Sequence, residues 1–182
     1  MPERSDEALM KAWAEGSMAA FEQLYARHRK PLYRYILRQC GNDAEANDLY
    51  QGCWEKIIRA RRQYRPAAPF TAWMYRIARN HVIDHFRRSR PADELQEERL
   101  SSNDPEPAER LEDEQRSERL RQAIAGLPDE QKDALLLRMD AGLDVQTIAD
   151  VSGCNRETAK SRLRYAMRKL RAALEETDGI RR

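Results

Sequence analysis

The chain has 182 residues, of which 35% are charged and 41% are hydrophobic, an ordinary composition for a globular protein with one domain or two small ones. Only seven glycines and no convincing alternation of polar and apolar residues indicate an all-α fold. The N-terminus is charged and no apolar run approaches the ~18 residues that cross a bilayer, so we expect neither a signal peptide nor membrane insertion.

The charges are unevenly distributed along the chain, although the net charge is only +2. Residues 54–90 contain ten Lys or Arg and two acidic residues, whereas residues 91–118 contain eleven acidic residues and three Arg. We therefore expect two small helical domains, residues 1–90 and 107–182, joined by a flexible acidic linker over 91–106 that also contains Pro, Ser and Asn.

The N-terminal part begins with three predicted helices. A short helix over 5–15 is followed by a long one that begins at Ser17 and is interrupted by Pro31, which lacks a backbone donor. The third helix is predicted over 44–62. Its outward face carries a polar row, which is most often only a solvent-facing row: Asp48, Gln51 and Glu55.

A Pro-rich loop at 61–69, with Tyr64 at its middle, leads into a helix predicted over 70–88. One face of this helix is apolar, and another carries arginines flanked by Trp73 and Tyr75. Rings on which bases can stack, beside guanidinium groups that can hold a backbone, are what a single-stranded nucleic-acid site requires. A core tryptophan with solvated arginines would produce the same pattern, so both interpretations stay open on these residues alone.

A metal site has weaker support. His81, Asp84 and His85 lie within about one helical turn, and histidines at i and i+4 have a metal-ligand spacing. A catalytic zinc would need a third placed ligand, and the chain has no H-E-x-x-H motif. We therefore expect no metal and no cofactor.

The cysteines are far apart without a C-x-x-C pair, which argues against disulfides and favours a reducing cytoplasm: Cys40, Cys53 and Cys154.

The C-terminal part is predicted to contain a helix over 107–126 and a second helix opened by Pro128, whose missing donor costs nothing in a first turn. Residues 144–171 then form two helices joined by a glycine turn, a helix-turn-helix. Asp144 can cap the first helix, and Gly153 can take the positive φ that ends it. Asn155 can cap the second, whose inward stripe has helical spacing: Ala159, Leu163, Ala166 and Leu170.

The outward face of this last helix is strongly basic. Residues 156–171 contain seven Lys or Arg and one acidic residue, Glu157. A solvated terminal helix could show the same charge. The paired caps and the one-sided charge together favour a helix that contacts phosphates and base edges in a major groove.

Several motifs in a fixed order are similar to those of one protein family. They are FEQLYARHRKPLYRYIL at 21–37, AEANDLYQ at 44–51, FTAWMYRIARNHVIDHFRR at 70–88, and LPDEQKDALLLR with TIADVSGCNRETAKSRLRYAMRKL within 127–170. Nearly the whole chain resembles the extracytoplasmic-function (ECF) sigma factors, the two-domain bacterial subunits that give RNA polymerase its promoter specificity.

The resemblance implies roles for particular residues. The first domain would bind the polymerase clamp and open and read the −10 element, and the second would read the −35 duplex. The polymerase-facing residues would be Asp48, Gln51 and Trp54. The single-strand surface would hold Tyr64, Trp73, Tyr75, Arg76, Asn80 and Arg87. The duplex would meet Arg156, Lys160, Ser161, Arg164 and Arg168. Gly52 stands where the family usually has glutamate.

The implied partners are core RNA polymerase and promoter DNA, without enzyme chemistry in the chain itself. An anti-sigma factor is a candidate further partner, since in this family such a partner commonly covers the same basic faces. A stand-alone helix-turn-helix regulator is the alternative. That alternative would explain 127–171 but gives residues 70–88 no role.

Overall fold

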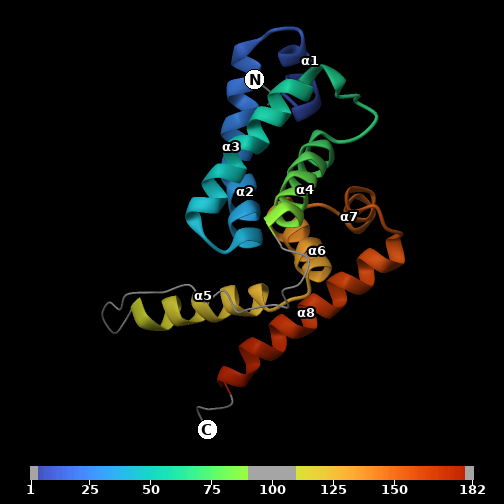
Figure 1. The fold of residues 1–182 in the computed structure, drawn as a ribbon. Helices are drawn as coiled ribbons and strands as arrows, with labels where there is room; N and C mark the ends of the chain where they lie inside the picture. Colours follow the sequence, from blue (N-terminus) through green and yellow to red (C-terminus); the bar gives the residue numbers. More distant parts are fainter. Residues whose placement is uncertain (1–3, 90–109, 179–182) are drawn as a thin grey trace.

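The computed structural model describes residues 4–89 and 110–178, and in this part all regular structure is helical (Figure 1). The all-α prediction is therefore confirmed for the described residues, and the predicted linker over 91–106 lies outside them. The N-terminal half contains α1 (Asp6–Ala14), α2 (Met18–Cys40), α3 (Asp43–Ala60), a 3-10 turn (Arg61–Gln63) and α4 (Phe70–Ser89). The C-terminal half contains α5 (Arg110–Ala125), α6 (Asp129–Met139), α7 (Val145–Ser152) and α8 (Arg156–Asp178).

Helix α2 runs through Pro31 without a break, so the predicted interruption was wrong. Leu24 on one side of the proline and Leu32 on the other are fully buried. Both halves of the helix are thus fixed by packing, which outweighs the loss of one backbone hydrogen bond. Gly41, with φ 81°, ends the helix as a left-handed cap.

The first turn of α1 holds the loop before α4 in place. The Glu7 carboxylate accepts a hydrogen bond from the backbone N–H of Phe70 at 3.1 Å and so satisfies a free donor at the start of α4. Asp6 is bonded to Arg27 at 2.7 Å and to the His28 ring at 2.6 Å. These contacts tie α1, α2 and α4 together around the loop.

The helix-turn-helix forms as predicted. The Asp144 carboxylate caps α7 by accepting from the N–H of Thr147, and Asn155 caps α8 by accepting from the N–H of Thr158, both at 2.8 Å. Gly153 ends α7 at φ 67°. Ile148 is fully buried in the angle between the two helices.

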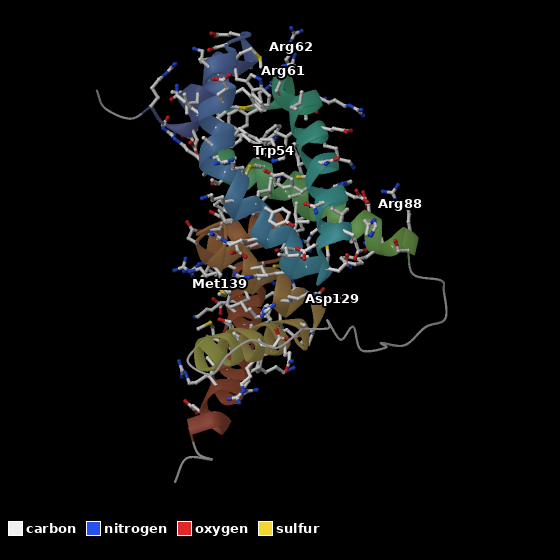
Figure 2. All side chains as sticks on the ribbon, turned by 90° about the vertical axis from the view of Figure 1, so that its left-hand side faces the viewer. Trp54, Arg61, Arg62, Arg88, Asp129 and Met139 are labelled. Atoms are coloured by element: carbon white, nitrogen blue, oxygen red, sulfur yellow. The ribbon has the colours of Figure 1, made fainter. Side chains whose placement is uncertain are left out.

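The two halves lie against each other. Helix α4 contacts α7, and α2 contacts α5 and α6, so the N-terminal half stacks on the C-terminal half (Figure 2). Figure 2 shows Trp54 within the upper half and Met139 in the lower half. Across the described residues, no helix combines the length and the apolar character needed to cross a bilayer.

Candidate nucleic-acid interface

Helix α8 presents the basic residues predicted to meet duplex DNA. In its inward stripe Ala159 and Ala166 are fully covered, Leu170 is buried and Leu163 is partly buried. The predicted contacts are exposed except Ser161, which is half-buried: Arg156, Lys160, Arg164 and Arg168. The structure therefore brings these five residues to one side of α8.

Tyr165 is a residue of this surface that the sequence analysis did not single out. Its ring is 40% exposed. The guanidinium carbons of Arg164 and Arg168 lie 5.4 and 5.0 Å from its centroid. Such cation–π contacts contribute about 0.5–1 kcal/mol at exposed sites. Arg162, in contrast, is bonded to Glu130 and so links α8 to α6.

Helix α4 carries the second predicted surface. Arg76, Asn80 and Arg87 are exposed, and the Trp73 ring is half-buried beside them. Residues 73, 76, 80 and 87 fall on one face at helical spacing. Four of the six residues predicted for the single-strand surface therefore share a face.

The other two are buried and do not lie on that exposed face in this structure. Tyr75 is 1% exposed and packs edge-on against Tyr35 at 5.3 Å. Tyr64 is 9% exposed, packs against Trp73 at 5.4 Å, and its hydroxyl donates to the carbonyl of Ala68 at 2.8 Å. Burial raises the pKa of both phenols, so each stays neutral.

The polar row of α3 faces solvent as predicted, with Asp48, Gln51 and Glu55 all exposed. Trp54 does not belong to it. Its ring is 6% exposed and lies 4.9 Å from that of Tyr25 in an aromatic cluster between α2 and α3. Trp54 is thus packed in the core and does not lie on the exposed face of α3 in this structure.

The packing of α3 on α4 explains Gly52. A Cβ at this position would lie 2.7 Å from Nε2 of His81, so the imidazole occupies the space that a larger side chain would need. Burial lowers the pKa of His81. His85 instead bonds Glu45 at 2.5 Å. The two histidines thus have separate packing roles, and among the described residues no group of three or more His, Cys, Asp or Glu could hold a metal.

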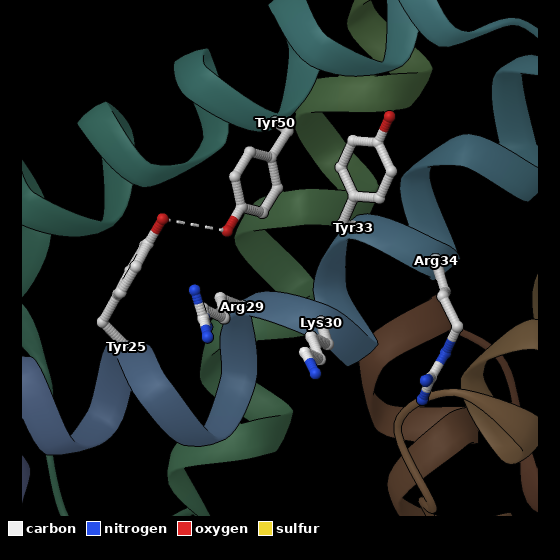
Figure 3. Close-up of a pocket in the computed structure, with 6 residues that line it drawn as sticks. All are labelled: Tyr25, Arg29, Lys30, Tyr33, Arg34 and Tyr50. Atoms are coloured by element: carbon white, nitrogen blue, oxygen red, sulfur yellow. Dashed lines mark hydrogen bonds between the residues drawn. The ribbon is translucent and has the colours of Figure 1, made fainter.

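A hollow of about 420 Å³ between α2 and α3 was not foreseen. It is lined by three tyrosines and three cations (Figure 3): Tyr25, Tyr33, Tyr50, Arg29, Lys30 and Arg34. The hydroxyl groups of Tyr50 and Tyr25 meet across it at 3.5 Å. Five of the lining residues belong to α2, and Tyr50 belongs to α3.

Comparison with known proteins finds one family match in the N-terminal half of the chain and another in the C-terminal half. Residues 24–91 match the family model Sigma-70 region 2, and residues 117–170 match Sigma-70, region 4. The ECF RNA polymerase sigma factor SigL of Mycobacterium tuberculosis is 33% identical over 169 residues, which cover 90% of this chain and 93% of that protein. RNA polymerase sigma factor CarQ of Myxococcus xanthus is 36% identical over 84 residues, 46% of this chain, and this match spans only about half (48%) of CarQ.

Solved structures show the same fold. CnrH in complex with the cytosolic domain of CnrY has a TM-score of 0.71 at 26% identity, covering 95% of this chain and 99% of that chain. The sigma factor RpoE in complex with the anti-sigma factor NepR from Bartonella quintana has a TM-score of 0.67 at 19% identity, covering 85% and 96%. With both family regions present and a relative matched over nearly its whole length, the chain belongs to the ECF family of RNA polymerase sigma factors.

Proposed function

We propose that this chain binds core RNA polymerase and directs transcription initiation through two DNA surfaces, a −35 duplex surface on α8 and a −10 single-strand surface on α4. The observation that carries the proposal is the presence of two basic faces on two separate helices, each in one of the two family regions. Residues 1–90 and 107–182 would be the corresponding domains, with 91–106 as the linker.

Helix α8 supports duplex reading. Its capped N-terminus follows the turn of a helix-turn-helix, and such a helix enters the major groove with its N-terminal residues toward the bases. Arg156 and Lys160 occupy that end, and Arg164 and Arg168 follow along the same side. Guanidinium groups can donate hydrogen bonds both to phosphates and to the major-groove edge of guanine.

Helix α4 supports binding of separated strands. A half-buried Trp73 ring with Arg76, Asn80 and Arg87 beside it offers one stacking platform and a polar track. Base stacking on a ring contributes about 1–3 kcal/mol, while unpairing costs a few kcal/mol per base. One or two captured bases could therefore help open a promoter, with polymerase carrying out the catalysis.

The polymerase-facing surface in this proposal is the exposed row of α3, Asp48 and Gln51 with Glu55. Function would then take place in the cytoplasm, where polymerase and chromosome meet. An anti-sigma factor is proposed as a regulator, because CnrH and RpoE, which share the fold, were solved in complex with CnrY and the anti-sigma factor NepR.

Reconstitution with purified core polymerase tests the function. We expect run-off transcripts from a subset of genomic promoter fragments only when the chain is added to core polymerase, and weak duplex binding by the chain alone. Tight, sequence-specific binding by the chain alone, with no polymerase-dependent transcript, would instead establish the stand-alone regulator.

A further inference from the structure

The start of α4 is held by a side chain of another helix. The backbone N–H of Phe70, the first residue of α4, donates to Oε1 of Glu7 on α1 at 3.1 Å, across 63 residues of chain. A helix leaves its first N–H groups without partners inside the helix, and a carboxylate at this end also interacts favourably with the helix dipole. Glu7 therefore acts as a cap that α4 does not find in its own sequence.

Glu7 can hold this position because α1 is itself well anchored. Leu9 and Met10, which follow it on α1, are fully buried in the core. Glu7 is half-buried. Figure 1 shows α1 at the end of the N-terminal half that points away from α5 and α8. The cap is therefore independent of the contact between the two halves of the chain.

The same turn of α1 reaches α4 by a second route through α2. The neighbouring carboxylate of Asp6 bonds Nε2 of His28 at 2.6 Å. The His28 ring lies 5.2 Å from the ring of Phe70, centroid to centroid. Residue 70 is thus fixed both at its backbone N–H, by Glu7, and at its side chain, by the His28 ring that Asp6 holds.

The fixed residue supports the ring proposed to stack on a base. Phe70 and Trp73 are three residues apart on one side of α4, and their ring centroids are 5.9 Å apart. Tyr64 completes a triangle of rings, 5.4 Å from Trp73 and 6.2 Å from Phe70. Burial, and then the carboxylates of Glu7 and Asp6, raise the pKa of Tyr64, which agrees with the closeness of α1 to this triangle.

The triangle leaves Trp73 as its most exposed member. Phe70 is fully buried and Tyr64 is 9% exposed, whereas the Trp73 ring is half-buried. A platform that is already ordered loses less conformational entropy when a ligand binds to it. Stacking of an unpaired base is available only after the strands separate, so the order of this ring affects the opening step and not the first encounter with duplex DNA.

We propose that Glu7 is a positioning residue for promoter opening, which holds the first N–H of α4 and thereby fixes the Trp73 ring where an unpaired base stacks. The role in opening rests on the proposed function, whereas the fixing of the ring does not. Glu7 contacts no nucleotide in this role. Helix α1, which carries no residue of either DNA surface, becomes part of the opening step through this hydrogen bond.

Fluorine NMR of the free chain labelled with 5-fluorotryptophan tests the fixing of the ring. The chain has three tryptophans, Trp13 on α1, Trp54 on α3 and Trp73 on α4, and single Trp→Phe variants assign their resonances. We expect Glu7→Ala to shift or broaden the Trp73 resonance and to leave the other two unchanged. An unchanged Trp73 resonance, or an equal change in all three, would overturn the positioning role.

Two further variants separate the hydrogen bond from packing. Glu7→Met keeps the length of the side chain without an acceptor oxygen and should behave as Glu7→Ala does. Glu7→Gln keeps an oxygen that can accept from the N–H of Phe70 and should restore the wild-type spectrum. Ser17→Ala, which removes the cap of α2 in the same half, controls for a general loss of stability and should leave the Trp73 resonance unchanged.

The kinetics of promoter opening test the functional consequence. Fluorescence of 2-aminopurine in the −10 element of an active promoter reports unstacking as holoenzyme concentration is varied. The plateau rate constant measures opening, and the half-saturating concentration measures closed-complex binding. We expect Glu7→Ala and Glu7→Met to lower the plateau roughly threefold to tenfold, as for the loss of one hydrogen bond, with half-saturation unchanged.

The same kinetics contain the results that would contradict the proposal. Glu7→Gln and Ser17→Ala should both retain the wild-type plateau. A normal plateau in Glu7→Ala and Glu7→Met, or a plateau in Glu7→Gln as low as theirs, would overturn the role of the hydrogen bond in opening. Absence of polymerase-dependent opening by the wild-type chain is a separate result, which would refute the proposed function and leave the NMR test of the ring intact.

Discussion

At the scale of single residues, packing decides which side chains are available to a partner. Trp54 and Tyr75 are of types that often form interfaces, yet they are only 6% and 1% exposed. Gly52 shows the opposite effect, because the His81 ring occupies the space that a side chain at position 52 would need. Each case follows from how closely α3, α2 and α4 approach one another.

Gly52 gives a testable coupling with His81. Replacing glycine by alanine within a helix usually stabilises by about 0.5–1 kcal/mol, but here the new Cβ would lie 2.7 Å from the imidazole. We expect Gly52→Ala to be neutral or destabilising in the wild-type background and stabilising by about 1 kcal/mol in a His81→Ala background. Urea unfolding of the four proteins measures this, and additive effects within about 0.3 kcal/mol would contradict the contact.

Ser152 gives a second prediction at this scale. Its Oγ is buried at the turn of the helix-turn-helix and, among the described residues, has no hydrogen-bond partner. Removal of an unsatisfied buried hydroxyl should stabilise the protein by on the order of 1 kcal/mol, or about 2–4 °C in Tm at this chain length. Thermal unfolding of Ser152→Ala should show this rise, and the exposed control Ser117→Ala should not. A lower Tm for Ser152→Ala would mean that the hydroxyl is satisfied.

At the scale of helices, α4 and α8 share basic character but differ in what surrounds it. Arg164 and Arg168 of α8 lie against the Tyr165 ring and stay exposed. Arg76 and Arg79 of α4 are bonded to the other half of the protein. The basic side of α8 is therefore exposed in this structure, whereas we expect the arginines of α4 to become fully available only after a rearrangement.

For α8, we predict that Lys160→Ala and Arg164→Ala weaken use of a −35-dependent promoter. Loss of a base-reading arginine should cost about 1–3 kcal/mol and relax preference at one base pair, whereas loss of a phosphate contact should reduce the salt slope by about one. Filter binding of holoenzyme across salt concentrations separates the two. Arg121→Ala, on the exposed side of α5, is the control. Normal binding by both α8 variants would remove α8 from the DNA surface.

For α4, we predict that Asn80→Ala/Arg87→Ala blocks promoter opening and not assembly. Both side chains are exposed, so the fold should survive, while loss of the polar track removes strand contacts made only after melting. Permanganate reactivity of unpaired thymines near −10 should fall, with polymerase binding and closed complexes unchanged. Arg88→Ala, on another side of the same helix, is the control. Full reactivity of the double variant would exclude this face.

At the scale of the whole molecule, the closed arrangement limits what the chain can reach. A compact chain of 182 residues has a radius of gyration of about 16 Å. The −35 and −10 elements lie about 25 base pairs apart, roughly 85 Å along straight duplex at ~3.4 Å per step. The halves must therefore separate before α8 and α4 act on one promoter.

This geometry predicts a response to polymerase. Addition of core polymerase to the chain carrying a pair of dyes at the exposed positions Asn47 and Ala172 should lower energy transfer between them, because promoter use requires the separated state. Unchanged high transfer in an active holoenzyme would show that the closed arrangement persists during initiation.

The sequence by itself determined the local structure. Side-chain caps at Asp144 and Asn155, the glycine at 153 and the helical spacing of apolar residues predicted the helix-turn-helix, because these signals act within a few residues of each other. The exposed row of α3 was also predictable from periodicity, whereas Trp73, Arg76, Asn80 and Arg87 of α4 were grouped through the resemblance to the family. Pro31 shows the limit of local rules. It was predicted to interrupt α2, but the helix continues because residues on both sides of the proline are buried in the core.

Only the tertiary structure decided which faces are covered and by what. Tyr64 and Tyr75 have sequence contexts that suit a nucleic-acid surface, and distant residues such as Tyr35 bury one of them. Asp133 and Asp140 have no distinguishing signal in the sequence, yet both are buried, and their donors on α2 and α4 are more than 50 residues away in the chain. Periodicity reports that a helix has two faces, but the partner of each face is set by contacts between residues far apart in sequence.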